Sequence, residues 1–176
     1  MIILLLLFDI SVHLFWQAHL SSYKFYADSR NPYVYAHPTT EVFEIVKRVE
    51  QYAEVHEDGH NMPIQVICPG DDYWPLPWYF RSFTNVGWWN KVDNEAPLAP
   101  VIIASPAVEA DLARKLWELT PVEERQMYFP FFDDPYYVWL RPEVELLGFV
   151  RKDLWEACQR KSVPDPNELI RKASEK

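Results

Sequence analysis

The first apolar stretch of the chain is long enough to cross a membrane. Residues 2–8 are apolar without interruption, and apolar positions continue to Trp16, with Asp9 and His13 as ionisable breaks. A spanning helix requires roughly 20 such residues. A secretory signal is the rival interpretation, but the basic leading segment and an Ala-x-Ala cleavage site are both missing. We therefore predict a transmembrane helix over residues 1–19, as the last span of a larger membrane protein or of a truncated gene product.

The predicted span contains two ionisable residues and is followed by a connector with aromatic residues. Asp9 and His13 lie four residues apart and so share one helical face. Ionisable residues inside a bilayer are typically functional, although their charge can also face neighbouring helices that this chain lacks. Residues 20–38 contain a cluster of turn formers and predict a juxtamembrane connector. The residues expected at the membrane interface are Trp16, Tyr23 and Tyr26.

Beyond the connector, helical spacing of apolar residues predicts three helices. Thr40 is the expected N-cap of the first, which ends near His56, and Ser105 with Pro106 begins the second, which runs to about Leu119. Asp153 is the expected cap of the third, which runs through Lys161. The predicted inner faces are Val42, Ile45, Val46, Val49, Tyr52 and Ala53 for the first helix, and Val108, Leu112 and Leu116 for the second.

Short apolar runs between these helices predict strands. The expected strands are 63–68, 85–89, 100–104, 126–131 and 144–151. Their alternation with helices indicates a three-layer α/β sandwich with a mixed, partly parallel, Rossmann-like sheet. The soluble domain is predicted to span residues 39–161, with its strand order left open. A polar tail follows at residues 162–176, where Asp165-Pro166 is a helix-start signal.

One stretch, Gly70-Asp-Asp-Tyr-Trp-Pro-Leu-Pro-Trp-Tyr-Phe-Arg81, follows the first predicted strand. Its two prolines exclude a strand and the middle of a helix but suit the first turn of a helix. We predict a short helix from about Pro75 to Phe83 with Trp74 as its N-cap. Residues 70–74 then lie just beyond the carboxyl end of a strand, which is where open α/β sheets bind ligands.

Net charge and composition limit the classes of partner that the chain is expected to bind. The net charge of -9 and pI near 5.0 argue against nucleic acid, which requires a basic face. Aromatic residues are 16% of the chain and include 8 Trp, which favours either a dense core or a surface that stacks on sugars or lipid headgroups. The chain has no phosphate loop, dinucleotide fingerprint or Gly-x-Ser-x-Gly motif.

Several segments together resemble the C-terminal region of polytopic prokaryotic membrane proteins, the flippase-activity-associated or mannosyltransferase-like relatives of the GT-C glycosyltransferases. Besides the central stretch, the resemblance is carried by Trp16-Gln-Ala, Asp28-Ser-Arg-Asn-Pro-Tyr-Val-Tyr-Ala-His37, Pro100-Val-Ile-Ile-Ala-Ser105 and Leu140-Arg-Pro142. Glu143 stands where relatives are expected to have glycine. The resemblance implies polyprenyl-phosphate-linked sugars as substrates and catalytic acids in a loop between early membrane helices, a region absent from this chain.

The expected binding residues for a lipid-linked sugar or glycan are Asp72, Tyr73, Trp74, Trp78 and Arg81. Trp74 would stack on a sugar, Asp72 would accept hydroxyl hydrogen bonds and Arg81 would hold a phosphate or carboxylate. In the competing interpretation the stretch is a folding element. There one of Asp71 and Asp72 accepts the N–H groups of the helix start, and Trp78 and Trp88 belong to the core.

Metal and redox chemistry have weaker signals. His56 and His60 have a zinc-like spacing, but Gly59 breaks the helix between them, so we expect a solvated turn and no metal. No cofactor is expected in this chain, although the resemblance allows a divalent metal in the full-length family. Cys68 and Cys158 are expected to be buried free thiols, although an extracytoplasmic location permits a disulfide.

Two functions remain open at this level. In one, the chain is the extracytoplasmic C-terminal domain of a membrane glycosyltransferase-like protein, inactive alone without the preceding membrane helices. In the other, it is a non-enzymatic, membrane-tethered binding or scaffold module that assists translocation of lipid-linked glycans. Both place the chain in the cell membrane with one span.

Overall fold

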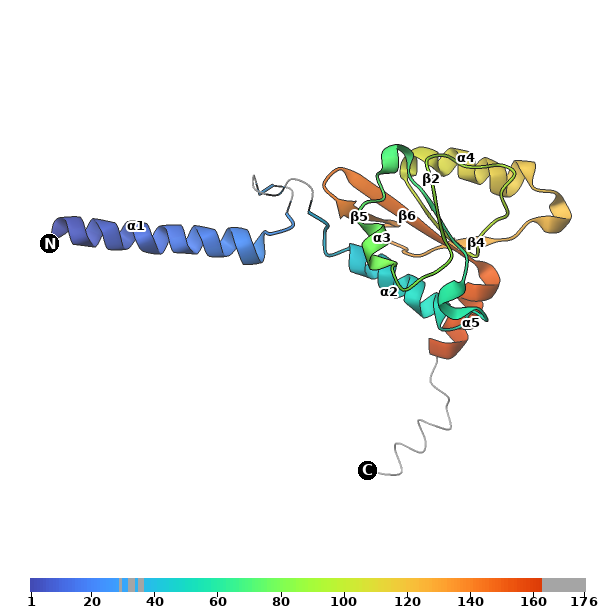
Figure 1. The fold of residues 1–176 in the computed structure, drawn as a ribbon, viewed down its shortest axis with the longest axis horizontal. Coiled ribbons are helices and arrows are strands. Elements are labelled where there is room, and N and C mark those ends of the chain that lie inside the picture. Colours follow the sequence, from blue (N-terminus) through green and yellow to red (C-terminus); the bar gives the residue numbers. More distant parts are fainter. Residues whose placement is uncertain (29, 32–33, 35–36, 163–176) are drawn as a thin grey trace, which may run out of the picture.

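The structure is a computed structural model that describes residues 1–162 except 29, 32–33 and 35–36. It confirms the predicted fold class, because a partly parallel sheet of six strands is preceded by an apolar N-terminal helix (Figure 1). That helix, α1 (Ile2–His19), continues as one π-helical turn to Lys24, and together they are long and apolar enough to span a membrane. No residue of α1 is buried.

The sheet combines a parallel half with an antiparallel half. Its strands are β1 (Ile64–Ile67), β2 (Val86–Trp89), β3 (Val101–Ala104), β4 (Tyr128–Pro130), β5 (Tyr137–Arg141) and β6 (Val144–Arg151). The first three are parallel in the order β2-β1-β3, and β6 runs antiparallel to β3. The other edge of β6 pairs with β5 along its first half and with β4 along its second half.

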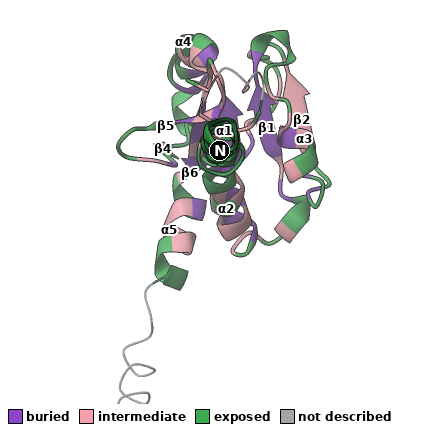
Figure 2. Cartoon of the chain, turned by 90° about the vertical axis from the view of Figure 1, so that its left-hand side faces the viewer, coloured by how far each residue is buried: buried purple, intermediate pink, exposed green. Residues whose placement is uncertain are grey.

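Helices cover both faces of the sheet. Helices α2 (Val42–Ala53), α3 (Leu76–Tyr79) and α5 (Lys152–Ser162) pack on one face, and α4 (Glu109–Arg114) packs on the other. Side chains of β3 alternate between these two cores, with Ile103 in the first and Ile102 in the second. Strands buried on both faces explain why the sequence shows continuous apolar runs. Figure 2 shows the buried strands between exposed outer helix faces.

The predicted helix faces are confirmed, and the predicted helix starts are confirmed only in part. The Ser105 hydroxyl accepts the Ala107 N–H at 3.3 Å, as expected of an N-cap. Thr40 does not cap α2, where the N-cap is Glu41. The Glu41 carboxylate accepts the backbone N–H of Trp139 at 2.7 Å, and the Thr39 hydroxyl donates to the Trp139 carbonyl. Pairing with β5 therefore fixes where α2 begins.

The helix predicted after β1 needs correction in its length and its N-cap, and one strand was not predicted. The helix predicted over residues 75–83 is only the turn α3, because after Tyr79 the chain closes into tighter turns in which Phe83 N–H bonds to the Phe80 carbonyl at 2.9 Å. Trp74 is not its N-cap. Strand β5 was not predicted, because its partner is an edge of β6 that only the folded sheet exposes. The helix-start signal at Asp165-Pro166 lies outside the described residues.

The turn between β5 and β6 explains why glycine suits the position of Glu143. Glu143 has a φ of 66°, in the left-handed region that disfavours residues with a Cβ. Its side chain is exposed, so the backbone conformation comes from the tight connection and is not imposed by packing.

We predict that Glu143→Gly raises the free energy of unfolding by about 0.5–1 kcal/mol, because relief of the left-handed strain exceeds the added freedom of the unfolded chain. Urea unfolding of the full chain in detergent would measure the change. Glu145→Gly, two residues later within β6, is the matched control and should destabilise the protein. Equal effects of both substitutions would contradict the assignment of strain to Glu143.

Candidate ligand-binding site

The central stretch lies at the carboxyl edge of the parallel strands, as the sequence predicts. The chain leaves β1 and turns through Gly70 and Asp71, whose φ values are 70° and 59°. The Asp71 N–H donates to the side-chain oxygen of Asn90 at 3.1 Å, and Asn90 directly follows β2. The loop after β1 is therefore tied to the end of its neighbouring strand.

Arg141 joins this loop to the end of β5. Its Nη2 donates to Asp72 Oδ1 at 2.7 Å, and its Nε donates to the Trp74 carbonyl at 3.3 Å. The Arg141 side chain is 24% exposed and that of Asp72 is 54% exposed. Two segments quoted for the family resemblance, 69 residues apart at this contact, thus meet in the fold.

These three residues offer complementary binding chemistry. Trp74, whose carbonyl accepts from Arg141, is 57% exposed and presents a flat apolar ring at the surface. Asp72 is a hydrogen-bond acceptor at the surface. Among the contacts of the described residues, the Nη1 donors of Arg141 have no protein acceptor, so they remain available to an oxyanion. An acceptor, a stacking surface and a guanidinium can together bind a sugar phosphate.

The other predicted site residues, Tyr73, Trp78 and Arg81, make contacts elsewhere. Tyr73 is half-buried, with its ring centroid 4.8 Å from that of Trp88. Desolvation, with Asp71 as a further cause, raises the pKa of Tyr73, so its hydroxyl stays protonated at neutral pH. Arg81 lies 4.8 Å above the Trp78 ring and donates to the Trp78 carbonyl at 2.9 Å. Trp78 and Arg81 therefore form a second group on α3 and the turn after it.

Two structural interpretations of the stretch also need correction. Neither Asp71 nor Asp72 caps α3, which has no side-chain cap. Trp78 is 65% exposed and is not a core residue, whereas Trp88 is half-buried and packs against the core as expected. Arg141 was missed by sequence analysis as a site residue. The available signal was its place in Leu140-Arg-Pro142.

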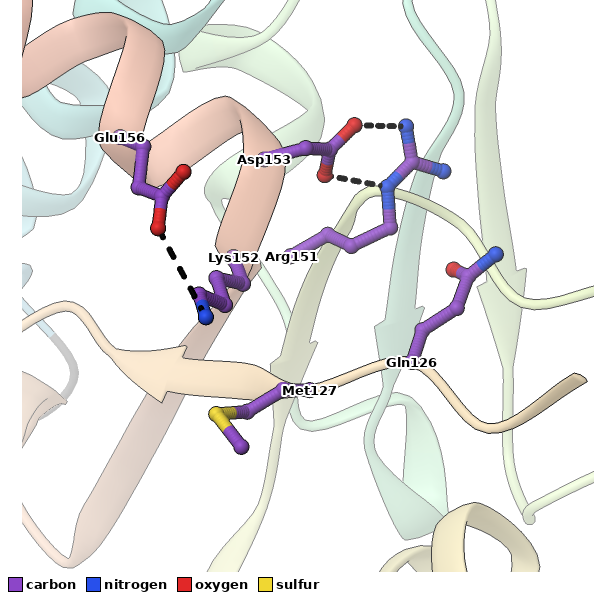
Figure 3. Close-up of a pocket in the computed structure, with 6 residues that line it drawn as sticks. All are labelled: Gln126, Met127, Arg151, Lys152, Asp153 and Glu156. Atoms are coloured by element: carbon purple, nitrogen blue, oxygen red, sulfur yellow. Dashed lines mark hydrogen bonds and ion pairs between the residues drawn. The ribbon is translucent and has the colours of Figure 1, made fainter. Parts of the chain in front are cut away.

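A groove beside α5 is a weaker candidate (Figure 3). It is open, has a volume of about 460 Å³ and is lined by Gln126, Met127, Arg151, Lys152, Asp153 and Glu156. Arg151 makes two hydrogen bonds to Asp153 at 2.6 and 2.8 Å, and Lys152 lies 3.7 Å from Glu156. Because each cation already has an anion, the groove offers little net charge to select a ligand.

Lys115 is buried, and its hydrogen bonds to backbone carbonyls explain how the charge is accommodated. Its ammonium donates to the backbone carbonyls of Asp93 and Ala96, and burial lowers its pKa. The buried Gln65 donates to the Pro97 carbonyl at 2.7 Å. Both side chains thus hold the polar loop that precedes β3.

The histidines considered for a metal have other partners, and of the two cysteines only Cys68 is buried. His60 Nε2 lies 2.7 Å from a Glu50 oxygen, and His56 accepts the Asp58 N–H at 3.1 Å. Within the described part of the chain, no three His, Cys, Asp or Glu residues are grouped to hold a metal. Cys68 and Cys158 are free, and burial raises the pKa of Cys68 to about 12. Cys158 is only half-buried.

Comparison with known proteins leaves the site to be interpreted from its own geometry. No family model, curated protein or solved structure matches this chain. The resemblance of the central stretch to glycosyltransferase-like membrane proteins therefore stays a prediction. The arrangement of Asp72, Trp74 and Arg141 is the observation from which function is inferred.

Proposed function

We propose that the chain is the extracytoplasmic domain of a membrane glycosyltransferase-like protein and that it binds a polyprenyl-phosphate-linked sugar. The observation that carries the proposal is the contact of Arg141 with both Asp72 and the carbonyl of the exposed Trp74, at the carboxyl edge of β1. Ligands of open α/β sheets bind at this edge. Trp74 stacks on the sugar ring, Asp72 accepts hydrogen bonds from its hydroxyl groups, and Arg141 donates hydrogen bonds to the phosphate.

The position of the site in the chain supports a lipid-linked substrate. The domain begins where the Thr39 N–H bonds to the Leu140 carbonyl at 2.9 Å, and Leu140 directly precedes Arg141. The connector from α1 therefore joins the domain next to the site. A ligand whose lipid remains in the bilayer needs a binding group close to the membrane tether.

The role assigned to this chain is binding, and chemistry is assigned to the rest of the parent protein. In the resembled family, the catalytic acids lie between early membrane helices, and any divalent metal belongs with them. Asp72 is already engaged by Arg141, which suits a residue that positions a substrate. The domain then presents the lipid-linked sugar, and catalysis by the isolated chain is not expected.

We predict that Trp74→Ala, Asp72→Asn and Arg141→Lys each weaken binding of a short-chain prenyl-phosphate mannose at least tenfold, about 1.4 kcal/mol. Arg141→Lys keeps the charge but removes the planar fork. Calorimetric titration of the full chain in nanodiscs would measure the affinity. Trp117→Ala is the matched control, since Trp117 is 50% exposed on a helical segment at the other face of the sheet.

Thermal unfolding separates this role from a purely structural one. Each site variant should lower the thermal unfolding midpoint by no more than a few degrees, which corresponds to about 1 kcal/mol for a domain of this size. A larger fall in the midpoint, together with no binding by the unmutated chain, would mean that the central stretch serves folding. Unchanged binding in all three variants would instead reject the site.

A separate prediction concerns the side of the membrane. In a Cys158→Ser background, Asn94→Cys in intact cells should react with a membrane-impermeant maleimide, because Asn94 is exposed in the loop before β3. Cys68 is buried with a pKa near 12 and should stay unlabelled, which gives the internal control. Labelling of Asn94→Cys only after lysis would place the domain in the cytoplasm.

A further inference from the structure

A second group of exposed aromatic side chains lies on α2 and α3. Phe43 on α2 is 55% exposed and Trp78 on α3 is 65% exposed. Tyr79, the half-buried residue after Trp78 on α3, meets Phe43 edge-on with a centroid distance of 5.6 Å. The exposed guanidinium of Arg81 lies over Trp78. We call Phe43, Trp78 and Tyr79 the aromatic patch.

The aromatic patch lies at the end of the domain that receives the connector. The Phe43 N–H bonds to the Thr40 carbonyl at 3.2 Å, one residue after the contact of Thr39 with β5. Figure 1 shows α3 and the start of α2 together at this end. Both elements therefore lie on the side of the domain that is tied to α1.

The connector is too short to take this end far from the bilayer. The Asn31 amide donates to the carbonyls of Ser21 and Phe25 at 3.3 and 2.9 Å, which ties Asn31 to the end of the apolar helix. Residues 31–39 reach at most roughly 30 Å when fully extended. The patch is thus held within about one domain diameter of the membrane surface.

We propose that the aromatic patch docks into the headgroup layer of the membrane that α1 spans, with Arg81 donating to lipid phosphates. Trp and Tyr prefer this layer because one end of the ring is apolar and the other is polar. The net charge of -9 gives no general attraction to anionic lipid, so aromatic burial holds the domain down. The inference depends on α1 spanning the bilayer and not on sugar binding.

Site-directed spin labelling of the full chain in phosphatidylcholine nanodiscs tests this docking. Labels are placed through Phe43→Cys, Trp78→Cys or, as a control, Trp117→Cys in a Cys158→Ser background. The ratio of collisions with oxygen to collisions with a water-soluble nickel chelate reports membrane depth. We expect a several-fold higher ratio at 43 and 78 than at 117, unchanged by adding phosphatidylglycerol or salt.

The possible results separate the alternatives. Equal ratios at the three positions would overturn the proposal, and so would labels at 43 and 78 that neither reagent reaches, because protein would then cover the patch. A label at Val12→Cys must show the depth of the bilayer core, and an aqueous result there would overturn both anchoring and docking. Circular dichroism excludes variants that fail to fold. Similar collision ratios at positions 43 and 78 show that the result does not come from a local effect of one label.

Discussion

Strand β6 is the constraint on which the domain and its candidate site depend. Its eight residues pair with β3 along one edge and with both β4 and β5 along the other. The contact of β6 with Phe131 allows no side chain at Gly148, where an added Cβ would lie 2.2 Å from the Phe131 ring. The register of β5 against β6 then places Arg141 at the strand end, beside Asp72.

The same register explains how the tether and the site come together. Leu140 is fully buried and accepts the Thr39 N–H, so the strand that carries Arg141 also receives the first residue of the domain. Three distant parts of the chain, the connector, the central stretch and the β5–β6 hairpin, therefore meet at one end of the sheet. A shift of one residue in β5 would reverse which side chains face the core and would turn Arg141 away from Asp72.

The aromatic residues of the central stretch divide according to where water can reach. Leu76 and Phe80 are buried against α2 and the sheet, while Trp74 and Trp78 are more than half exposed. A contiguous exposed apolar patch commonly marks a site for a ligand, a protein or a membrane. The two exposed tryptophans belong to different groups, one with the Asp72–Arg141 pair and one with Arg81, so the proposed sugar site and the proposed membrane contact use different tryptophans.

The amino-acid sequence by itself determined the elements whose signal is local. The apolar helix, the buried stripe of α2, the cap at Ser105 and the runs of β1 and β3 follow from spacing and side-chain type over a few residues. The location of residues 70–74 beyond a strand end also followed, because two prolines leave few alternatives.

Only the tertiary structure decided the strand order, the existence of β5 and the partner of Asp72. These depend on pairing between residues far apart, such as Arg141 with Asp72, and local patterns carry no information about which distant edge a strand joins. The start of α2 shows the same limit. Thr40 has the better local capping signal. The helix start is nevertheless fixed by β5, because the Thr39 hydroxyl donates to the Trp139 carbonyl and the Glu41 carboxylate accepts the Trp139 N–H, which satisfies both backbone groups of that residue.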